Sequence, residues 1–138
     1  MTSMSALDRI TRLLDETPMV RLAVVFGSAA RRTENPGSDI DLGVSWVNGS
    51  GQSASDLVVA LERAAGRRVD LVTLDDAPPL LRFEIARDGI VLVEREPHAW
   101  ADFRARAMID WWDWAPTARM MHSVMAERVR QEAGPGSA

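Results

Sequence analysis

The sequence predicts a mixed α+β domain: a small mixed β-sheet flanked by helices, followed by a helical C-terminal extension. Four short runs rich in β-forming residues alternate with segments whose apolar residues recur every three or four positions. After these runs, only the helical spacing continues. We therefore divide the chain into a core (residues 1–96), a C-terminal helical extension of the same domain (97–133) and a disordered tail (134–138).

The N-terminal half of the core begins with a helix and continues with two strands. Residues 5–16 have helical spacing, and the Ser5 hydroxyl can cap the free backbone N–H groups of the first turn. Residues 20–26, VRLAVVF, are short and dense in β-formers, which is typical of a buried strand. Residues 39–46 alternate between apolar and polar, as expected of a strand with one buried face. The Asn-Pro-Gly sequence between them predicts a loop.

The second half of the core continues this alternation. The pattern predicts a helix at 54–65 and a strand at 67–74. It then predicts a helix that Pro78 and Pro79 open and that runs to about Arg87, followed by a strand at 90–94. Beyond them the sequence is helical, and Pro116 is expected to break or restart the helix. The predicted sheet therefore has four strands.

Composition excludes several classes of function. The net charge is −4, from 20 acidic and 16 basic residues, whereas direct binding of a nucleic acid backbone normally requires a basic excess. The chain has no cysteine, so disulfides and thiolate metal sites are excluded. No apolar run approaches the roughly 20 residues that cross a bilayer, and the N-terminus lacks a signal-peptide pattern. We expect a cytoplasmic protein without membrane contact.

The residues that point to chemistry are Gly27-Ser28 and, after ten intervening residues, Asp39-Ile40-Asp41. A glycine lets the backbone approach a phosphate closely, and the Ser28 hydroxyl with adjacent N–H groups can hold phosphate oxygens. Asp39 and Asp41 project from one face of a strand, with Cα atoms about 7 Å apart. Mg²⁺ prefers one or two carboxylates together with phosphate oxygens and water. The motif therefore predicts a phosphate site beside a metal site.

Asp70 stands in an otherwise apolar strand, where a carboxylate needs a metal or a hydrogen-bonding partner. If that strand pairs beside the strand of Asp39 and Asp41, three carboxylates can hold two metal ions. Asp70 can then help to deprotonate an acceptor hydroxyl. The alternative is a strand-end ion pair with Arg67 or Arg68.

The segment GSAARRTENPGSDIDLGV, with RRVDLV farther along the chain, resembles the minimal nucleotidyltransferases of the DNA polymerase β superfamily. The short length and helical ending are similar to those of MntA-type antitoxins of HEPN/MNT toxin–antitoxin systems. This resemblance implies the nucleotidyltransferase fold, ATP as nucleotide donor and two Mg²⁺ ions.

The resemblance also implies roles for individual residues. Gly27 and Ser28 would contact the nucleotide phosphates. The metal ligands and catalytic triad would be Asp39, Asp41 and Asp70.

Two further residues are candidates for nucleotide binding. Arg31 falls where the family often has a basic residue, so it is either a contact to the phosphates or pyrophosphate, or part of a solvated loop. Ser38 directly precedes the strand of the metal site and is either a nucleotide contact or a turn residue.

The implied function is transfer of AMP from ATP to a tyrosine hydroxyl of a HEPN-domain RNase toxin. The chain has no tyrosine, so a tyrosine acceptor has to come from a partner. Two alternatives stay open. One is a small-molecule nucleotidyltransferase of the aminoglycoside type, and the other is an antitoxin that blocks its partner sterically without catalysis.

Aromatic residues in the C-terminal extension indicate an interface. Trp111, Trp112 and Trp114 cannot all point the same way on one helix, so at least one faces outward. Tryptophan is enriched at interface hot spots. The methionines of the last helix fit the same surface, although core packing is equally compatible with them. We expect the C-terminal helices to contact a HEPN partner, or a second copy of the chain in a homo-oligomer.

Overall fold

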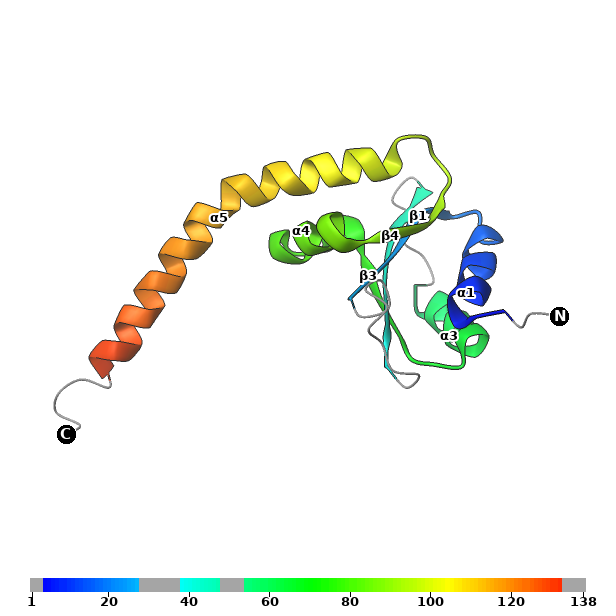
Figure 1. The fold of residues 1–138 in the computed structure, drawn as a ribbon, viewed down its shortest axis with the longest axis horizontal. Coiled ribbons are helices and arrows are strands. Elements are labelled where there is room, and N and C mark those ends of the chain that lie inside the picture. Colours follow the sequence, from blue (N-terminus) through cyan, green and yellow to red (C-terminus); the bar gives the residue numbers. More distant parts are fainter. Residues whose placement is uncertain (1–3, 28–37, 48–53, 133–138) are drawn as a thin grey trace.

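The computed structural model describes residues 4–27, 38–47 and 54–132, which form a four-stranded sheet with helices on both faces (Figure 1). The strands are β1 (Val20–Phe26), β2 (Ile40–Trp46), β3 (Val69–Thr73) and β4 (Ile90–Glu94). The helices are α1 (Ala6–Asp15), α3 (Ala54–Ala65), α4 (Pro79–Asp88) and α5 (Ala99–Glu132), with a 3-10 turn η2 (Leu74–Asp76) after β3. The predicted α+β class is therefore confirmed.

The sheet is mixed, in the order β3-β2-β1-β4. β1 pairs antiparallel with both β2 and β4, whereas β2 and β3 run parallel. A parallel pair needs a crossover connection, and α3 supplies it. Because β2 and β3 run the same way, their N-terminal halves lie side by side at one end of the sheet.

Each face of the sheet has its own apolar core. Ala23 and Val25 of β1 pack with α1 and α3, while Leu22 and Val24 pack with α4 and the start of α5. Figure 1 shows α1 and α3 lying together, apart from α4 and α5. Since successive residues of a strand point to opposite faces, a central strand covered on both sides is apolar throughout.

Local sequence signals define the ends of several elements. The Ser5 hydroxyl accepts a hydrogen bond from the Asp8 backbone N–H at 3.1 Å, and the Asp8 carboxylate accepts one from the Ser5 N–H. This reciprocal capping box confirms the predicted cap of α1. β3 begins at Val69, two residues later than predicted, although the Arg68 carbonyl already accepts a hydrogen bond from the Ile40 N–H at 2.9 Å.

The prediction that Pro116 breaks the C-terminal helix is wrong. α5 continues through Pro116 as one helix, and Figure 1 shows it changing direction near its middle. A proline inside a helix removes one backbone hydrogen bond and clashes with the preceding turn, which kinks a helix without having to end it. The predicted tail, residues 134–138, lies outside the described residues.

The tryptophans of α5 face different ways, as predicted. Trp111 stacks on Phe83 of α4 with ring centroids 5.0 Å apart, whereas Trp112 is 70% exposed. The first half of α5 therefore packs against α4, while Trp112 and, to a smaller extent, Trp114 stay on the surface. No helix in the described part of the chain has the length and apolarity needed to cross a membrane.

Candidate active site

A cleft of about 500 Å³ opens where the end of β1 meets the first halves of β2 and β3. One wall is the face of the sheet at this end of the strands, and the other is α4. The sheet contributes Phe26, Gly27, Asp41, Asp70 and Val72, and the helix contributes Leu81, Glu84, Arg87 and Asp88. The cleft thus combines an apolar patch with an unusual concentration of charge.

Asp41 and Asp70 are direct neighbours in the parallel pairing of β2 and β3. Aligned residues on neighbouring strands point to the same face of a sheet, and both side chains line the cleft. On its other side, Asp41 is aligned with Phe26 of β1. The prediction that the strand of Asp70 pairs beside the strand of Asp41 is therefore confirmed.

Asp39 lies just before β2, exposed to solvent, and is not among the residues that line the cleft. Its charge is nevertheless close enough to act on Asp41. Within the described part of the chain, no three His, Cys, Asp or Glu side chains are arranged to hold one metal ion. The structure thus brings two of the three predicted carboxylates together and leaves Asp39 at the edge of the site.

The electrostatics of this site disfavour the charged form of Asp41. Partial burial raises the pKa of the Asp41 carboxyl, and the neighbouring charges of Asp70 and Asp39 raise it further. A cation among these carboxylates would relieve the repulsion. The oxygen donors also match the preference of Mg²⁺.

Gly27 brings the backbone directly against the Asp41 carboxylate. Its φ is +69°, and a Cβ at this position would lie 2.4 Å from Asp41 Oδ2. Only glycine fits both the left-handed conformation and the contact. The close backbone approach predicted for Gly27 therefore occurs, and it occurs beside the carboxylate. Ser28 and Arg31, the other predicted phosphate contacts before Asp39, lie outside the described residues.

Arg67 contacts the segment that leads into β2 rather than Asp70. Its Nε donates a hydrogen bond of 3.0 Å to the Ser38 carbonyl, and its Nη2 donates to the same oxygen. The described residues form no ion pair with Asp70, so the alternative of a strand-end ion pair is not observed. Arg67 instead fixes the peptide directly before Asp39.

Sequence reasoning missed the wall formed by α4. Glu84, Arg87 and Asp88 follow one another at spacings of three and one residues, with Leu81 three residues before Glu84. Spacings of three and four place residues on the same side of a helix, so this pattern was visible in the sequence. What the sequence lacked was the packing of α4 that directs this side toward Asp41 and Asp70.

Comparison with known proteins supports a nucleotide-transfer site. Residues 8–98 match the family described as Polymerase beta, Nucleotidyltransferase. The chain is also 38% identical over 74 residues to the Methanocaldococcus jannaschii protein named "Putative protein adenylyltransferase MJ0435". That alignment covers 51% of this chain and 77% of the archaeal protein.

Solved structures share the fold. A toxin–antitoxin crystal structure with AMP-PNP contains a chain with a TM-score of 0.73 and 24% identity, over 86% of this chain and 98% of that one. A complex of tri-AMPylated Shewanella oneidensis HEPN toxin with MNT antitoxin gives 0.68 and 23%, over 87% and 96%. The "Structure of putative minimal nucleotidyltransferase" gives a TM-score of 0.51 and 30% identity, over 65% of this chain and 98% of that one. Since the family match spans most of the chain and includes the cleft-lining strands, this protein belongs to the polymerase β nucleotidyltransferase family.

Proposed function

We propose that this chain is a cytoplasmic, Mg²⁺-dependent adenylyltransferase that transfers AMP from ATP to a tyrosine hydroxyl of a HEPN-domain toxin. The observation that carries the proposal is the pairing of Asp41 with Asp70 in a cleft against the Gly27 backbone. Family membership supports the reaction class. The archaeal relative and the toxin–antitoxin complexes of the same fold support a protein acceptor.

The residues at this end of the sheet divide the work of the reaction. Asp39, Asp41 and Asp70 would hold Mg²⁺, which when bound neutralises phosphate charge and favours ionisation of the acceptor hydroxyl. The acceptor oxygen forms a bond to the α-phosphorus, and the bond to the leaving pyrophosphate breaks. Asp70, exposed in the cleft, accepts the hydroxyl proton.

We assign the phosphate contacts to the segment between β1 and β2. The Gly27 backbone lies directly against the Asp41 carboxylate, and we propose that it contacts a phosphate there. Ser28 and Arg31 are the proposed side-chain contacts, and Ser38 is proposed as a further one. Arg67 donates a hydrogen bond to the Ser38 carbonyl, so the backbone directly before Asp39 is held in place.

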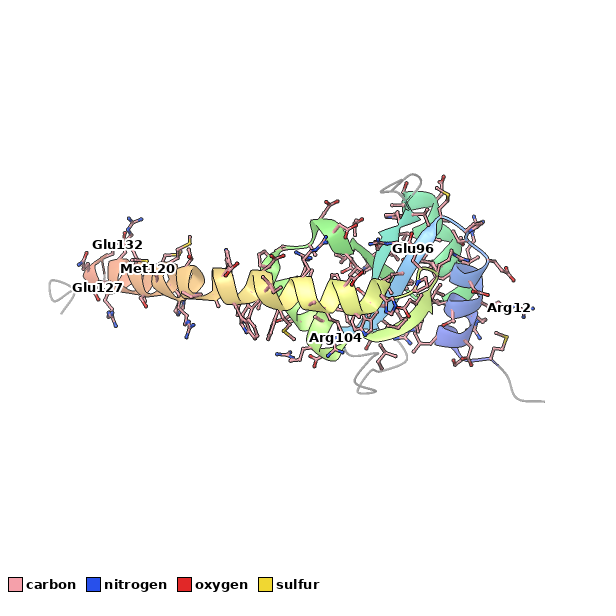
Figure 2. The ribbon with its side chains drawn as sticks, turned by 90° about the horizontal axis from the view of Figure 1, so that it is seen from above. Arg12, Glu96, Arg104, Met120, Glu127 and Glu132 are labelled. Carbon is pink, nitrogen blue, oxygen red and sulfur yellow. The ribbon has the colours of Figure 1, made fainter. Side chains whose placement is uncertain are left out.

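The partner surface is the second half of α5. We treat residues 1–96 as the nucleotidyltransferase core and 97–133 as the extension that presents this surface. Figure 2 shows Met120, Glu127 and Glu132 on the part of α5 that reaches beyond the sheet. Its exposed apolar side chains are Met120, Met121, Val124, Met125 and Val129, which we call the α5 apolar face.

Labelling with ATP in an extract of the native host tests this proposal. With α-labelled ATP and Mg²⁺ we expect one small labelled protein. With γ-labelled ATP the same protein should stay unlabelled, because pyrophosphate leaves. Asp70→Asn should reduce labelling at least about a hundredfold. Asp76→Asn, an exposed carboxylate on η2, is the matched control and should label normally.

Each alternative function has a distinct outcome. Unlabelled partner that is still bound and inhibited would favour steric neutralisation. Resistance to an aminoglycoside that depends on Asp70 would favour a small-molecule acceptor. Labelling that survives Asp70→Asn would contradict the assigned role of Asp70.

Gly27→Ala should impair transfer beyond its effect on folding. The new Cβ would collide with Asp41 Oδ2 and displace that carboxylate. The matched control is Gly66→Ala, because Gly66 has a φ of +68° and open space around it. Both variants should lose about 1 kcal/mol in urea unfolding, the cost of a left-handed alanine. Only Gly27→Ala should lose most of its transfer rate, and equal rates would refute the contact.

A further inference from the structure

We propose that Arg87 binds a phosphate group of the nucleotide from the α4 wall of the cleft, an inference that rests on the proposed nucleotide site. Arg87 is the only basic residue among the described residues that line this cleft. The four carboxylates there are Asp41, Asp70, Glu84 and Asp88.

Two contacts fix the Arg87 guanidinium at the cleft. Its Nε donates to the Asp88 carboxylate at 3.1 Å, and its Nη2 donates to Asp88 Oδ2 at 2.8 Å. Its Cζ lies 5.6 Å from the centroid of the Phe83 ring. A planar group held by a carboxylate and by an aromatic ring is already oriented before a ligand arrives.

The orientation leaves hydrogen-bond donors for a ligand. A guanidinium has five N–H donors, and Asp88 engages only Nε and Nη2. The Nη1 group makes no hydrogen bond with the described residues. The Arg87 side chain is 53% exposed, so a ligand in the cleft can reach it. A planar donor with free N–H groups is suited to two oxygens of one phosphate.

The distribution of charge in the cleft indicates why a phosphate ligand would need Arg87. Asp41 and Asp70 repel a polyphosphate, and a Mg²⁺ ion that they would hold would offset this repulsion on the sheet side of the cleft. On the α4 side, Asp88 is paired with Arg87, whereas Glu84 would repel the same ligand. Arg87 supplies the positive charge on that wall, so it can hold phosphates that the metal ligands do not reach.

Calorimetric titration of the full chain with AMP-PNP and Mg²⁺ tests this role without an acceptor. Arg87→Gln should weaken binding about ten- to a hundredfold, as expected for lost hydrogen bonds to a charged group. Arg87→Lys keeps the charge without the planar donor pair, so its affinity for AMP-PNP should lie between those of the parent and of Arg87→Gln. Arg63→Gln, an exposed arginine in the last turn of α3, is the control and should bind like the parent. Thermal melts check that each variant is folded.

The outcomes separate this inference from the proposed acceptor. Folded Arg87→Gln that binds AMP-PNP as tightly as the parent would overturn the assignment, even if partner labelling is intact. Weaker binding in Arg87→Gln alone supports it, even if no protein is labelled. That combination would support the nucleotide site and refute the proposal that the acceptor is a protein.

Discussion

Asp41→Asn is expected to reduce AMP transfer about a thousandfold or more while making the metal-free protein more stable. Transfer is expected to fail because asparagine lacks the negative charge with which Asp41 would hold Mg²⁺. Stability rises because the variant removes a carboxylate whose charged form is disfavoured by burial and by Asp70 and Asp39. Initial rates of partner labelling and thermal melts in EDTA measure the two effects.

The stability gained by Asp41→Asn should depend on pH. Because the pKa of Asp41 is raised in the folded state, its ionisation costs stability as pH rises above its ordinary value of 3.8. The variant Asp41→Asn should therefore melt at a higher temperature than the parent at neutral pH, and this gain should disappear below pH 3.8. Mg²⁺ should stabilise the parent more than the variant. A variant that melts below the parent in EDTA at neutral pH would contradict the repulsion that the structure indicates at Asp41.

Placing glutamates at Met121 and Met125 is expected to weaken partner binding at least about a hundredfold. Both residues lie on the α5 apolar face, four positions apart and therefore one helical turn apart. Burying two carboxylates in an apolar contact is costly, whereas both side chains are exposed in the free chain. The melting temperature of the free protein should not change. Calorimetry with the labelled partner measures the affinity.

Ser123→Glu is the matched control for the α5 apolar face. Ser123 lies midway between Met121 and Met125 in sequence, so it points away from both on a helix. It is also exposed, so the added charge should leave affinity unchanged.

Light scattering of the free chain tests whether a second copy of the chain, rather than the HEPN partner, occupies the α5 apolar face. A dimer that Met121→Glu/Met125→Glu converts to a monomer, with partner affinity intact, would assign the face to a second copy of the chain.

Most of the fold could be predicted because its signals are local. The strand at 20–26, the helix at 54–65 and the strand at 90–94 occur at the predicted residues. Ser5 and Asp8 form a cap that depends only on neighbours in sequence. The failure at Pro116 is also local, since a proline disfavours a continuous helix without forbidding it.

The candidate site could be predicted only in part because its walls come from distant segments. The spacing of Asp39 and Asp41 was readable, but the alignment of Asp70 with Asp41 depended on which strands pair. The position of Arg87 required the packing of α4 across the sheet. Likewise, no spacing rule joins Arg67 to the Ser38 carbonyl, a contact across 29 positions of sequence.

The measurement that tests the central claim most directly is the intact mass of the purified partner after incubation with this protein, ATP and Mg²⁺. We expect a mass increase of one or more AMP units on a HEPN-domain partner, located on a tyrosine by peptide mapping and absent with Asp41→Asn. An unmodified partner that this chain nevertheless binds and inhibits would contradict it, because neutralisation would then need no nucleotide transfer.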